Sequence, residues 1–308
     1  MPSLRDVKRR ITSIRNTSKV THALEAVSAT KMRRWQERAL TARPYATKAL
    51  EFLALLKSKV SRKHAIFRES LKPDAPIAMV VITADKGLCG GHNARLMTKV
   101  IDQRPTTNDQ RQVYVSLGRY GRDYLKRRGY EIILEEIGFC DKVTREQIKD
   151  MYEFLEGGFL KGIFSKILIA YTEFHTTLKQ EPKIRHLLPV NEEDLHAIVE
   201  SITPRYGRYA ELNPKPFPLN PHFEYVFEPS VQEILPSLAK ELTQVALYHM
   251  VLESNASEHS ARMVAMKNAT DNANDILKDL TLQYNKARQA EITKGVLEVA
   301  AGAEALSS

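Results

Sequence analysis

A glycine-rich turn at residues 83–91 carries the residue types most suited to binding a phosphate group. Its sequence, Thr83-Ala84-Asp85-Lys86-Gly87-Leu88-Cys89-Gly90-Gly91, follows a predicted strand and precedes a predicted helix. Backbone amides at such a helix start can bind anions. The turn matches neither the GxxxxGKS/T nor the GxGxxG pattern. The sequence therefore favours a tight turn that needs glycine backbone angles over a nucleotide site.

The cysteines and histidines do not form a catalytic or metal-binding pattern. Cys89 and Cys140 have no CxxC spacing, and we interpret them as reduced core thiols of an intracellular protein. The nine histidines include no HExxH motif. His249 and His259 share one predicted helix but are too far apart to hold one ion. We therefore expect no catalytic site, no metal and no cofactor.

Basic residues are concentrated at the start of the chain. Residues 1–59 contain 14 Lys/Arg and 4 Asp/Glu, whereas the whole chain carries a formal net charge of +9. The run Lys31-Met32-Arg33-Arg34-Trp35 combines this charge with the single tryptophan, for which we expect a packing role. Such a surface can bind nucleic-acid phosphates or the carboxylates of a protein partner.

These side chains must be positioned by two very long terminal helices. In residues 1–60, apolar residues begin at the heptad spacing Leu4, Val7, Ile11 and Ile14. The apolar seam is predicted to shift phase near residues 15–31, to Val20, Leu24 and Val27, and to resume at Met32. Pro44 should kink this helix without ending it, because the apolar pattern continues beyond it.

The C-terminal segment 230–308 keeps one heptad register from Leu235 to Ala287, with His249, His259 and Thr270 as polar exceptions. A helix of this length needs a partner helix along its apolar side. We therefore predict that residues 1–60 and 230–308 form a long antiparallel coiled coil. The small apolar residues from Gly295 to Leu306 predict a projecting tip that partner proteins enclose.

The middle of the chain, residues 75–190, is predicted to be a small, Rossmann-like open α/β sheet domain. Thr144 and Gln147 have the spacing of a capping box at the start of a helix. A proline-rich connection, residues 191–229, leads to the last helix. The predicted strands are 77–83, 113–117, 132–136, 166–172 and an edge strand at 184–188.

Two segments resemble a known family. One is Ala256-Ser257-Glu258-His259-Ser260-Ala261-Arg262-Met263-Val264-Ala265-Met266-Lys267-Asn268-Ala269-Thr270-Asp271-Asn272, continued by Tyr284-Asn285-Lys286-Ala287-Arg288-Gln289-Ala290-Glu291-Ile292-Thr293. The other is residues 11–32, with the Gly87–Gly91 turn beyond it. Together they are similar to the gamma subunit of the F-type, rotary ATP synthase, and the resemblance covers nearly the whole chain.

The resemblance implies a non-catalytic central rotor shaft. Its coiled coil would turn inside a ring of three alpha and three beta subunits, and its α/β domain would meet the epsilon subunit and the membrane c-ring. Proton flow would turn the c-ring and the shaft, which changes the affinities of the beta-subunit catalytic sites. The implied protein binds no cofactor and no nucleic acid and does not insert into the membrane itself.

The resemblance also assigns residues that contact the beta subunits. Arg288 and Gln289 would meet a carboxylate-bearing loop, with Thr293 next to them. Arg262 corresponds to another interaction-prone position on the same helix. The basic stretch that would pack against an acidic lever of the beta subunit includes Lys19, Lys31, Arg33 and Arg34.

Two other functions remain as alternatives. A basic coiled-coil protein that binds nucleic acid would also explain the charge of the first helix, and a nucleotide-binding enzyme would use the turn at 83–91. We rank both below the rotor shaft. Since the N-terminus leads directly into helix, we expect a protein that is peripheral on the cytoplasmic face of a bacterial cell membrane.

Overall fold

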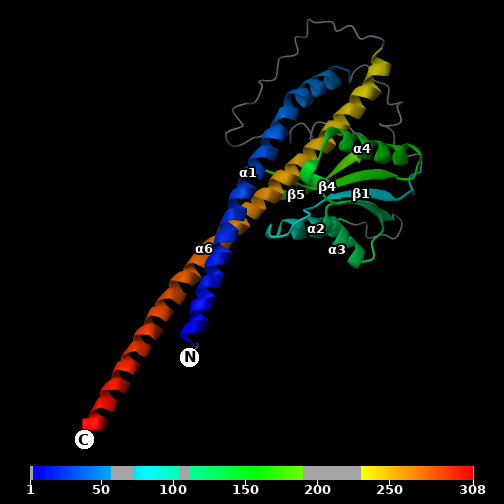
Figure 1. Ribbon diagram of the computed structural model, residues 1–308. Coiled ribbons are helices and arrows are strands. Elements are labelled where there is room, and N and C mark those ends of the chain that lie inside the picture. Colours follow the sequence, from blue (N-terminus) through cyan, green and yellow to red (C-terminus); the bar gives the residue numbers. More distant parts are fainter. Residues whose placement is uncertain (1–2, 57–71, 104–110, 190–229, 308) are drawn as a thin grey trace. The chain divides into compact units, whose positions relative to one another are not determined.

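A computed structural model describes residues 3–56, 72–103, 111–189 and 230–307 (Figure 1). Two compact units divide the chain. Met1–Ser28 and Met263–Ser308 form the first, called here the terminal unit, and Ala29–Arg262 form the second, called the sheet unit. The predicted connection 191–229 and the last residues of the predicted helix 1–60 lie outside the described residues.

Two long helices begin and end the described chain, as the heptad spacing predicted. Helix α1 spans Leu4–Leu56, and helix α6 spans Val231–Ser307. Helix α1 continues through Pro44, as predicted. Among the described residues, none of the helices has an apolar stretch long enough to cross a bilayer.

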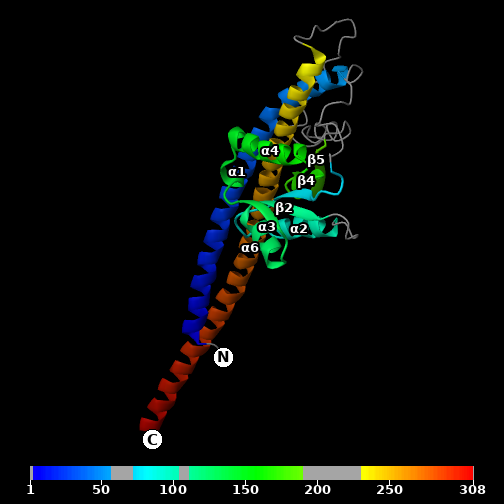
Figure 2. The same ribbon diagram turned by 90° about the vertical axis from the view of Figure 1, so that its right-hand side faces the viewer.

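The terminal unit is an antiparallel pair of helices. Ser18 Oγ donates a hydrogen bond to Asn274 Oδ1 at 2.9 Å, and the hydroxyls of Thr21 and Thr270 are 2.7 Å apart. A higher residue number on α1 is paired with a lower one on α6, so the two helices run in opposite directions. In both views the N-terminal part of α1 lies beside α6 (Figures 1 and 2). The predicted pairing of the chain ends is confirmed.

The buried side of α6 in the terminal unit follows the predicted heptad register. The residues withdrawn from solvent recur at alternating spacings of three and four, and the residues between them are exposed; they are Thr270, Ala273, Leu277, Leu280, Tyr284 and Ala287. Thr270 is one of the polar exceptions that the sequence placed in this register. Its hydroxyl meets Thr21 inside the interface, where a paired polar group specifies register.

The phase shift predicted on α1 does not occur. Val20 and Val27 are 59% and 54% exposed, whereas Thr21 and Ser28 are buried. The original heptad register continues because the small hydroxyl residues can form hydrogen bonds inside the interface, where Thr21 binds Thr270 and Ser28 Oγ binds the Leu24 carbonyl. Two valines are consequently left on an outer face of α1.

The sheet unit contains a five-stranded sheet with strand order β3-β2-β1-β4-β5. The strands are β1 (Ile77–Ile82), β2 (Gln112–Leu117), β3 (Ile132–Glu136), β4 (Lys166–Phe174) and β5 (Gln180–Leu188). The first four strands pair in parallel, and β5 closes an antiparallel hairpin with β4. The predicted mixed α/β fold with a mostly parallel sheet is confirmed.

Helices cover both faces of this sheet (Figure 1). Helices α2 (His92–Asp102) and α3 (Arg119–Arg127) pack on one face, through buried residues such as Leu96 and Leu125. On the other face, α4 (Arg145–Leu160) joins Trp35 of α1 and the α6 residues around Met250 in one core cluster. The packing role expected for the tryptophan is thereby confirmed.

Local sequence signals explain most element boundaries of the sheet unit. Thr144 and Gln147 form the predicted capping box at the start of α4. Strand β5 begins four residues before its predicted start at Ile184. Its polar first half, which includes Pro182, has no apolar alternation, and pairing with β4 holds it in the sheet. Proline is tolerated there because β5 is an edge strand.

Candidate functional site

The end of α6 extends past the start of α1 within the terminal unit. Continuing the register set by the Thr21–Thr270 pair places Leu4, the first residue of α1, opposite a position close to Arg288. Among the described residues, the roughly 20 that follow on α6 then have no partner helix, over a length of about 30 Å at the rise of an α-helix. The segment Gln289–Ser307 is called the tip below.

Three of the predicted beta-contacting residues lie where the tip begins. Arg288, Gln289 and Thr293 are all exposed. The Thr293 hydroxyl donates to the Gln289 carbonyl at 2.9 Å. Within the described residues, Arg288 forms no ion pair. Its guanidinium is therefore available to a carboxylate of another protein.

The tip also exposes several large apolar side chains. Ile292 and Val299 are 58% and 75% exposed, and Val296 and Leu297 are similarly uncovered. A cluster of uncovered apolar side chains marks a contact surface when it is contiguous. The small residues between them leave few groups for directional hydrogen bonds. An apolar sleeve of partner residues would cover the tip without fixing it at one angle.

The basic residues predicted on α1 occupy exposed or half-buried positions. Lys19 is exposed in the terminal unit, next to the exposed Val20. In the sheet unit, Arg33 and Arg34 are exposed and Lys31 is half-buried. These positions leave the positive charges of Lys19, Arg33 and Arg34 facing solvent, where they can attract an acidic partner.

Arg262, the fourth predicted contact residue on α6, is paired within the sheet unit. Its side chain is buried, with only 7% of the residue exposed. Nη2 and Nε donate to the carbonyls of Lys86 and Gly87 at 2.8 and 3.1 Å, and Nη1 is 2.7 Å from the carboxylate of Glu258. The guanidinium is thus paired inside the sheet unit, and the predicted contact of Arg262 with the beta subunit stays a prediction.

The turn at 83–91 is held by contacts within the chain. The Asp85 carboxylate accepts hydrogen bonds from the backbone amides of Arg119 and Gly138 at 3.0 and 2.9 Å. Two carbonyls of the turn face the Arg262 guanidinium. Carbonyls that bind a cationic group do not form an anion site, and this supports the reading of the segment as a structural turn. Cys89 is buried here, as predicted for a core thiol.

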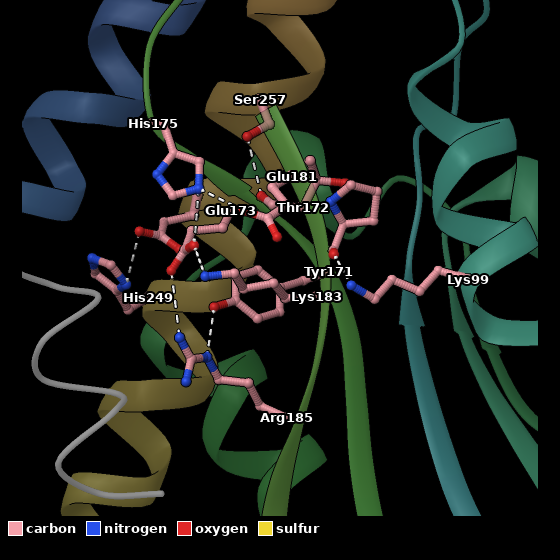
Figure 3. A network of polar contacts seen from close by, with 12 residues as sticks. Lys99, Tyr171, Thr172, Glu173, His175, Glu181, Lys183, Arg185, His249 and Ser257 are labelled. Carbon is pink, nitrogen blue, oxygen red and sulfur yellow. Dashed lines mark hydrogen bonds and ion pairs between the residues drawn. The ribbon is translucent and has the colours of Figure 1, made fainter. Parts of the chain in front are cut away.

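Charged residues also meet at the β4–β5 hairpin, inside the sheet unit (Figure 3). The Glu173 carboxylate contacts Lys183 Nζ, and it accepts a hydrogen bond from Arg185 Nη2 at 3.4 Å. His175 Nε2 lies 3.2 Å from the Glu173 carboxylate and also 3.2 Å from that of Glu181. No pattern in the sequence predicts this network, because pairing across the hairpin brings the charges together.

Glu173, His175 and Glu181 have the residue types of a metal site. Their potential ligand atoms lie within 4.8 Å of one another in the described part of the chain. Lys183 and Arg185 already neutralise the Glu173 carboxylate. Since the chain itself supplies the cations, we assign no metal to these residues.

Two titratable side chains of α6, His249 and Glu253, are buried close to this network. Figure 3 shows His249 beside it. Burial raises the pKa of Glu253 well above its usual range, and the nearby Glu173 carboxylate raises it further. Burial also lowers the pKa of His249 to about 3. Both changes favour the neutral form, as expected for groups removed from water. Burial in the folded chain therefore favours the protonated form of the Glu253 carboxyl.

The raised pKa of Glu253 predicts a specific pH dependence of stability. In the unfolded chain Glu253 releases its proton near 4.5, whereas in the folded chain it keeps the proton to higher pH. The folded state then binds more protons than the unfolded state, so this residue lowers the free energy of unfolding as pH rises. Glu253→Gln should remove that loss and raise the thermal midpoint at about pH 8, with little difference at about pH 4.

The measurement is thermal unfolding of the purified chain across that pH range. Glu291→Gln is the control, because Glu291 is an exposed carboxylate on the same helix. Equal pH profiles for wild type and Glu253→Gln would mean that Glu253 ionises normally in the folded chain.

The chain is similar to known proteins over nearly its whole length. A family model described as ATP synthase matches residues 3–306. The ATP synthase gamma chain of Chloroflexus aurantiacus is 38% identical over 313 residues, which cover 100% of both chains. The gamma chain of Pelotomaculum thermopropionicum is 36% identical over 309 residues, covering 99% of this chain and 100% of the relative.

Solved structures show the same fold at lower identity. A chain of the rotor of Euglena gracilis mitochondrial ATP synthase aligns with a TM-score of 0.61 and 16% identity, over 94% of this chain and 98% of that chain. A chain of the central stalk and c-ring of Tetrahymena thermophila mitochondrial ATP synthase aligns with a TM-score of 0.53 and 20% identity, over 81% and 99%. These matches support the architecture of long terminal helices and one α/β sheet.

Proposed function

Because this chain belongs to the ATP synthase gamma family, we propose that it is the central rotor shaft that couples c-ring rotation to the beta-subunit catalytic sites. The observation that carries the proposal is the antiparallel pairing of the two chain ends, with an exposed tip beyond it. A helical rod of this kind can transmit rotation along its length. The gamma chain is a non-catalytic subunit of the complex, and no cofactor is assigned to it.

The partners in this proposal are three alpha and three beta subunits around the helical rod, with epsilon and the c-ring at the sheet unit. The exposed apolar tip fits a sleeve of alpha and beta residues, because such a contact gains free energy from burial at every rotation angle. The structural relatives named above are, by their descriptions, chains of a rotor and of a central stalk with its c-ring.

Contacts with the beta subunits are proposed at two places. Arg288 can form a bidentate hydrogen-bonded pair with a carboxylate, which is strong and directional. Gln289 and Thr293 lie next to it on the exposed surface. On α1, the basic residues Lys19, Lys31, Arg33 and Arg34 are proposed to attract the acidic levers of the beta subunits, through forces that steer and are screened by salt.

The nucleic-acid alternative is not supported. The family model covers residues 3–306 and so includes the whole basic helix. The acidic protein partners proposed above would account for the charge of α1. The enzyme alternative loses its main support, because the turn at 83–91 directs carbonyls toward Arg262.

We place the protein on the periphery of the membrane, as a subunit of a membrane-associated complex. We further propose the cytoplasmic face of a bacterial membrane, since the relatives at 36% and 38% identity come from bacteria. None of the described helices is long and apolar enough to cross a bilayer.

Affinity purification tests the proposed function. A tagged chain recovered from its host's membranes in mild detergent should bring three alpha and three beta subunits, epsilon and the c-ring with it. Recovery of nucleic acid that dissociates steeply with salt, without these subunits, would favour the coiled-coil alternative. Recovery of the chain alone would contradict the rotor assignment.

A further inference from the structure

One stretch of α6 inside the sheet unit is enclosed on all sides. Every residue from Val251 to Ser260 is buried. Seven of these ten residues are polar or charged, namely Glu253, Ser254, Asn255, Ser257, Glu258, His259 and Ser260. A helix packed only against one apolar surface would show an apolar stripe and a solvated face. This segment instead needs hydrogen-bond partners around its whole circumference.

Those partners are backbone carbonyls of the surrounding segments. Asn255 Nδ2 donates to the carbonyl of Cys140, the first residue of the short 3-10 helix Cys140–Lys142, at 2.7 Å. Ser257 Oγ donates to Thr172 of β4 at 3.1 Å, and Ser260 Oγ to Thr177 in the β4–β5 turn at 2.8 Å. Side chains of one helix thus bind carbonyls of three separate segments.

Arg262, the last residue of the sheet unit, adds a fourth hydrogen-bond donor to Asn255, Ser257 and Ser260. These four residues are called the donor row below. It binds the carbonyls of Lys86 and Gly87, in the turn between β1 and α2. Glu258, one helical turn earlier, holds the guanidinium at 2.7 Å, and the ring Nδ1 of His259 is 3.1 Å away. Arg262 is the one charged donor of the row, so its hydrogen bonds are the strongest of the set.

The donors point in different directions around the helix axis. Successive residues of an α-helix are rotated by about 100°. The side chains of Asn255 and Arg262 therefore leave the helix on one side, whereas those of Ser257 and Ser260 leave it on others. Turning α6 about its own axis would break all of these hydrogen bonds together. A helix bound on one side only could roll more easily.

We propose that the donor row Asn255, Ser257, Ser260 and Arg262 fixes the rotational position of α6 in the sheet unit and transmits torque from the sheet unit to α6. Arg262 is the principal positioning residue. This inference rests on the proposed rotor function. Torque that reaches the sheet unit must pass to α6, and the row supplies contacts that resist rotation of the helix. Apolar packing alone resists such rotation less, because it is not directional.

The test is Arg262→Ala in the assembled, membrane-bound complex, with proton pumping and ATP hydrolysis measured on the same vesicles. We expect hydrolysis to continue while protons pumped per ATP hydrolysed fall by about an order of magnitude, as loss of a charge-assisted contact would allow. Arg262→Lys keeps the positive charge near Glu258 but cannot bind both carbonyls with a planar fork, so it should rescue coupling in part.

Thr144→Ala is the matched control. It removes the capping box of α4 and so destabilises the sheet unit without touching the donor row. An equal loss of coupling in Thr144→Ala and Arg262→Ala would assign the effect to general destabilisation and overturn the inference. Normal coupling in Arg262→Ala would overturn it as well.

A second variant keeps the inference testable if Arg262→Ala does not assemble. Ser257→Ala combined with Ser260→Ala removes two neutral donors and leaves every charge in place. We expect a smaller loss of pumping per ATP in that variant, and unchanged coupling would contradict the proposal. Wild-type vesicles distinguish the torque inference from the proposed rotor function. If wild-type vesicles pumped no protons on ATP hydrolysis, the rotor function itself would be refuted.

Discussion

Replacing Arg288 by alanine is expected to lower ATP synthesis by the assembled complex about tenfold or more. Hydrogen bonds to charged groups contribute roughly 1.5–3 kcal/mol, and 1.4 kcal/mol corresponds to a factor of ten. Arg288 is exposed at the start of the tip and forms no ion pair within the described residues, so the loss would report a contact with another subunit. Gln289→Ala should have a smaller effect in the same direction, because its amide is neutral.

The measurement is ATP synthesis driven by an imposed proton gradient, together with ATP hydrolysis and the yield of assembled complex. Lys294→Ala is the control, because Lys294 is exposed on the same helix and its Glu298 ion pair is a solvent-exposed one that contributes little. The purified chain should unfold at the wild-type temperature in all three variants. If neither Arg288→Ala nor Gln289→Ala changes synthesis or hydrolysis, the proposed contact with the beta subunit does not exist.

A proline at Ala273 should be far more damaging than removal of the end of the tip. Ala273 is buried between the two helices of the terminal unit. Proline there removes a backbone hydrogen bond and clashes with the preceding turn, at a cost of ~3 kcal/mol or more. The helix would kink within the paired region, so we expect loss of assembly or of all synthesis activity.

Truncation before Gly295 should leave most of the activity. The residues from Val296 to Ala303 are exposed and lie beyond the paired region, so their removal costs no described packing within the chain. Ala300→Pro is the matched control for Ala273→Pro, since it makes the same chemical change in the tip. Both variants and the truncation are compared by subunit recovery and ATP synthesis. Complete loss of assembly on truncation would show that the tip is an essential bearing.

Heptad spacing was sufficient to predict the two terminal helices and their pairing. The seam on α6 was correct from Thr270 to Ala287, because burial along a helix repeats with the helical period. On α1 the same reasoning gave too much weight to hydrophobicity. It assigned Val20 and Val27 to the interface, which Thr21 and Ser28 occupy instead. A hydroxyl with a hydrogen-bond partner can replace an apolar side chain at such a position. The partner of Thr21 lies on the other helix, and that of Ser28 is the Leu24 carbonyl of its own helix.

Local signals also predicted the sheet unit well. Apolar runs located the strands, and the residue pair Thr144 and Gln147 marked the start of α4. The first half of β5 was missed because its residues are polar and only pairing with β4 defines them as a strand. The pattern of apolar and charged residues alone left three functions open: a rotor shaft, a nucleic-acid-binding coiled coil and a nucleotide-binding enzyme. The resemblance of two segments to a family favoured the first.

Periodicity and local motifs, which depend on residues near one another along the chain, were enough to predict the long helices, most strands, the pairing of the chain ends and the family. Which polar residues are buried depends on tertiary packing instead. The network around Glu173 and the contacts of Arg262 join residues that are distant along the chain. A buried charge is stable only beside its partners, and those partners come together only when the chain folds.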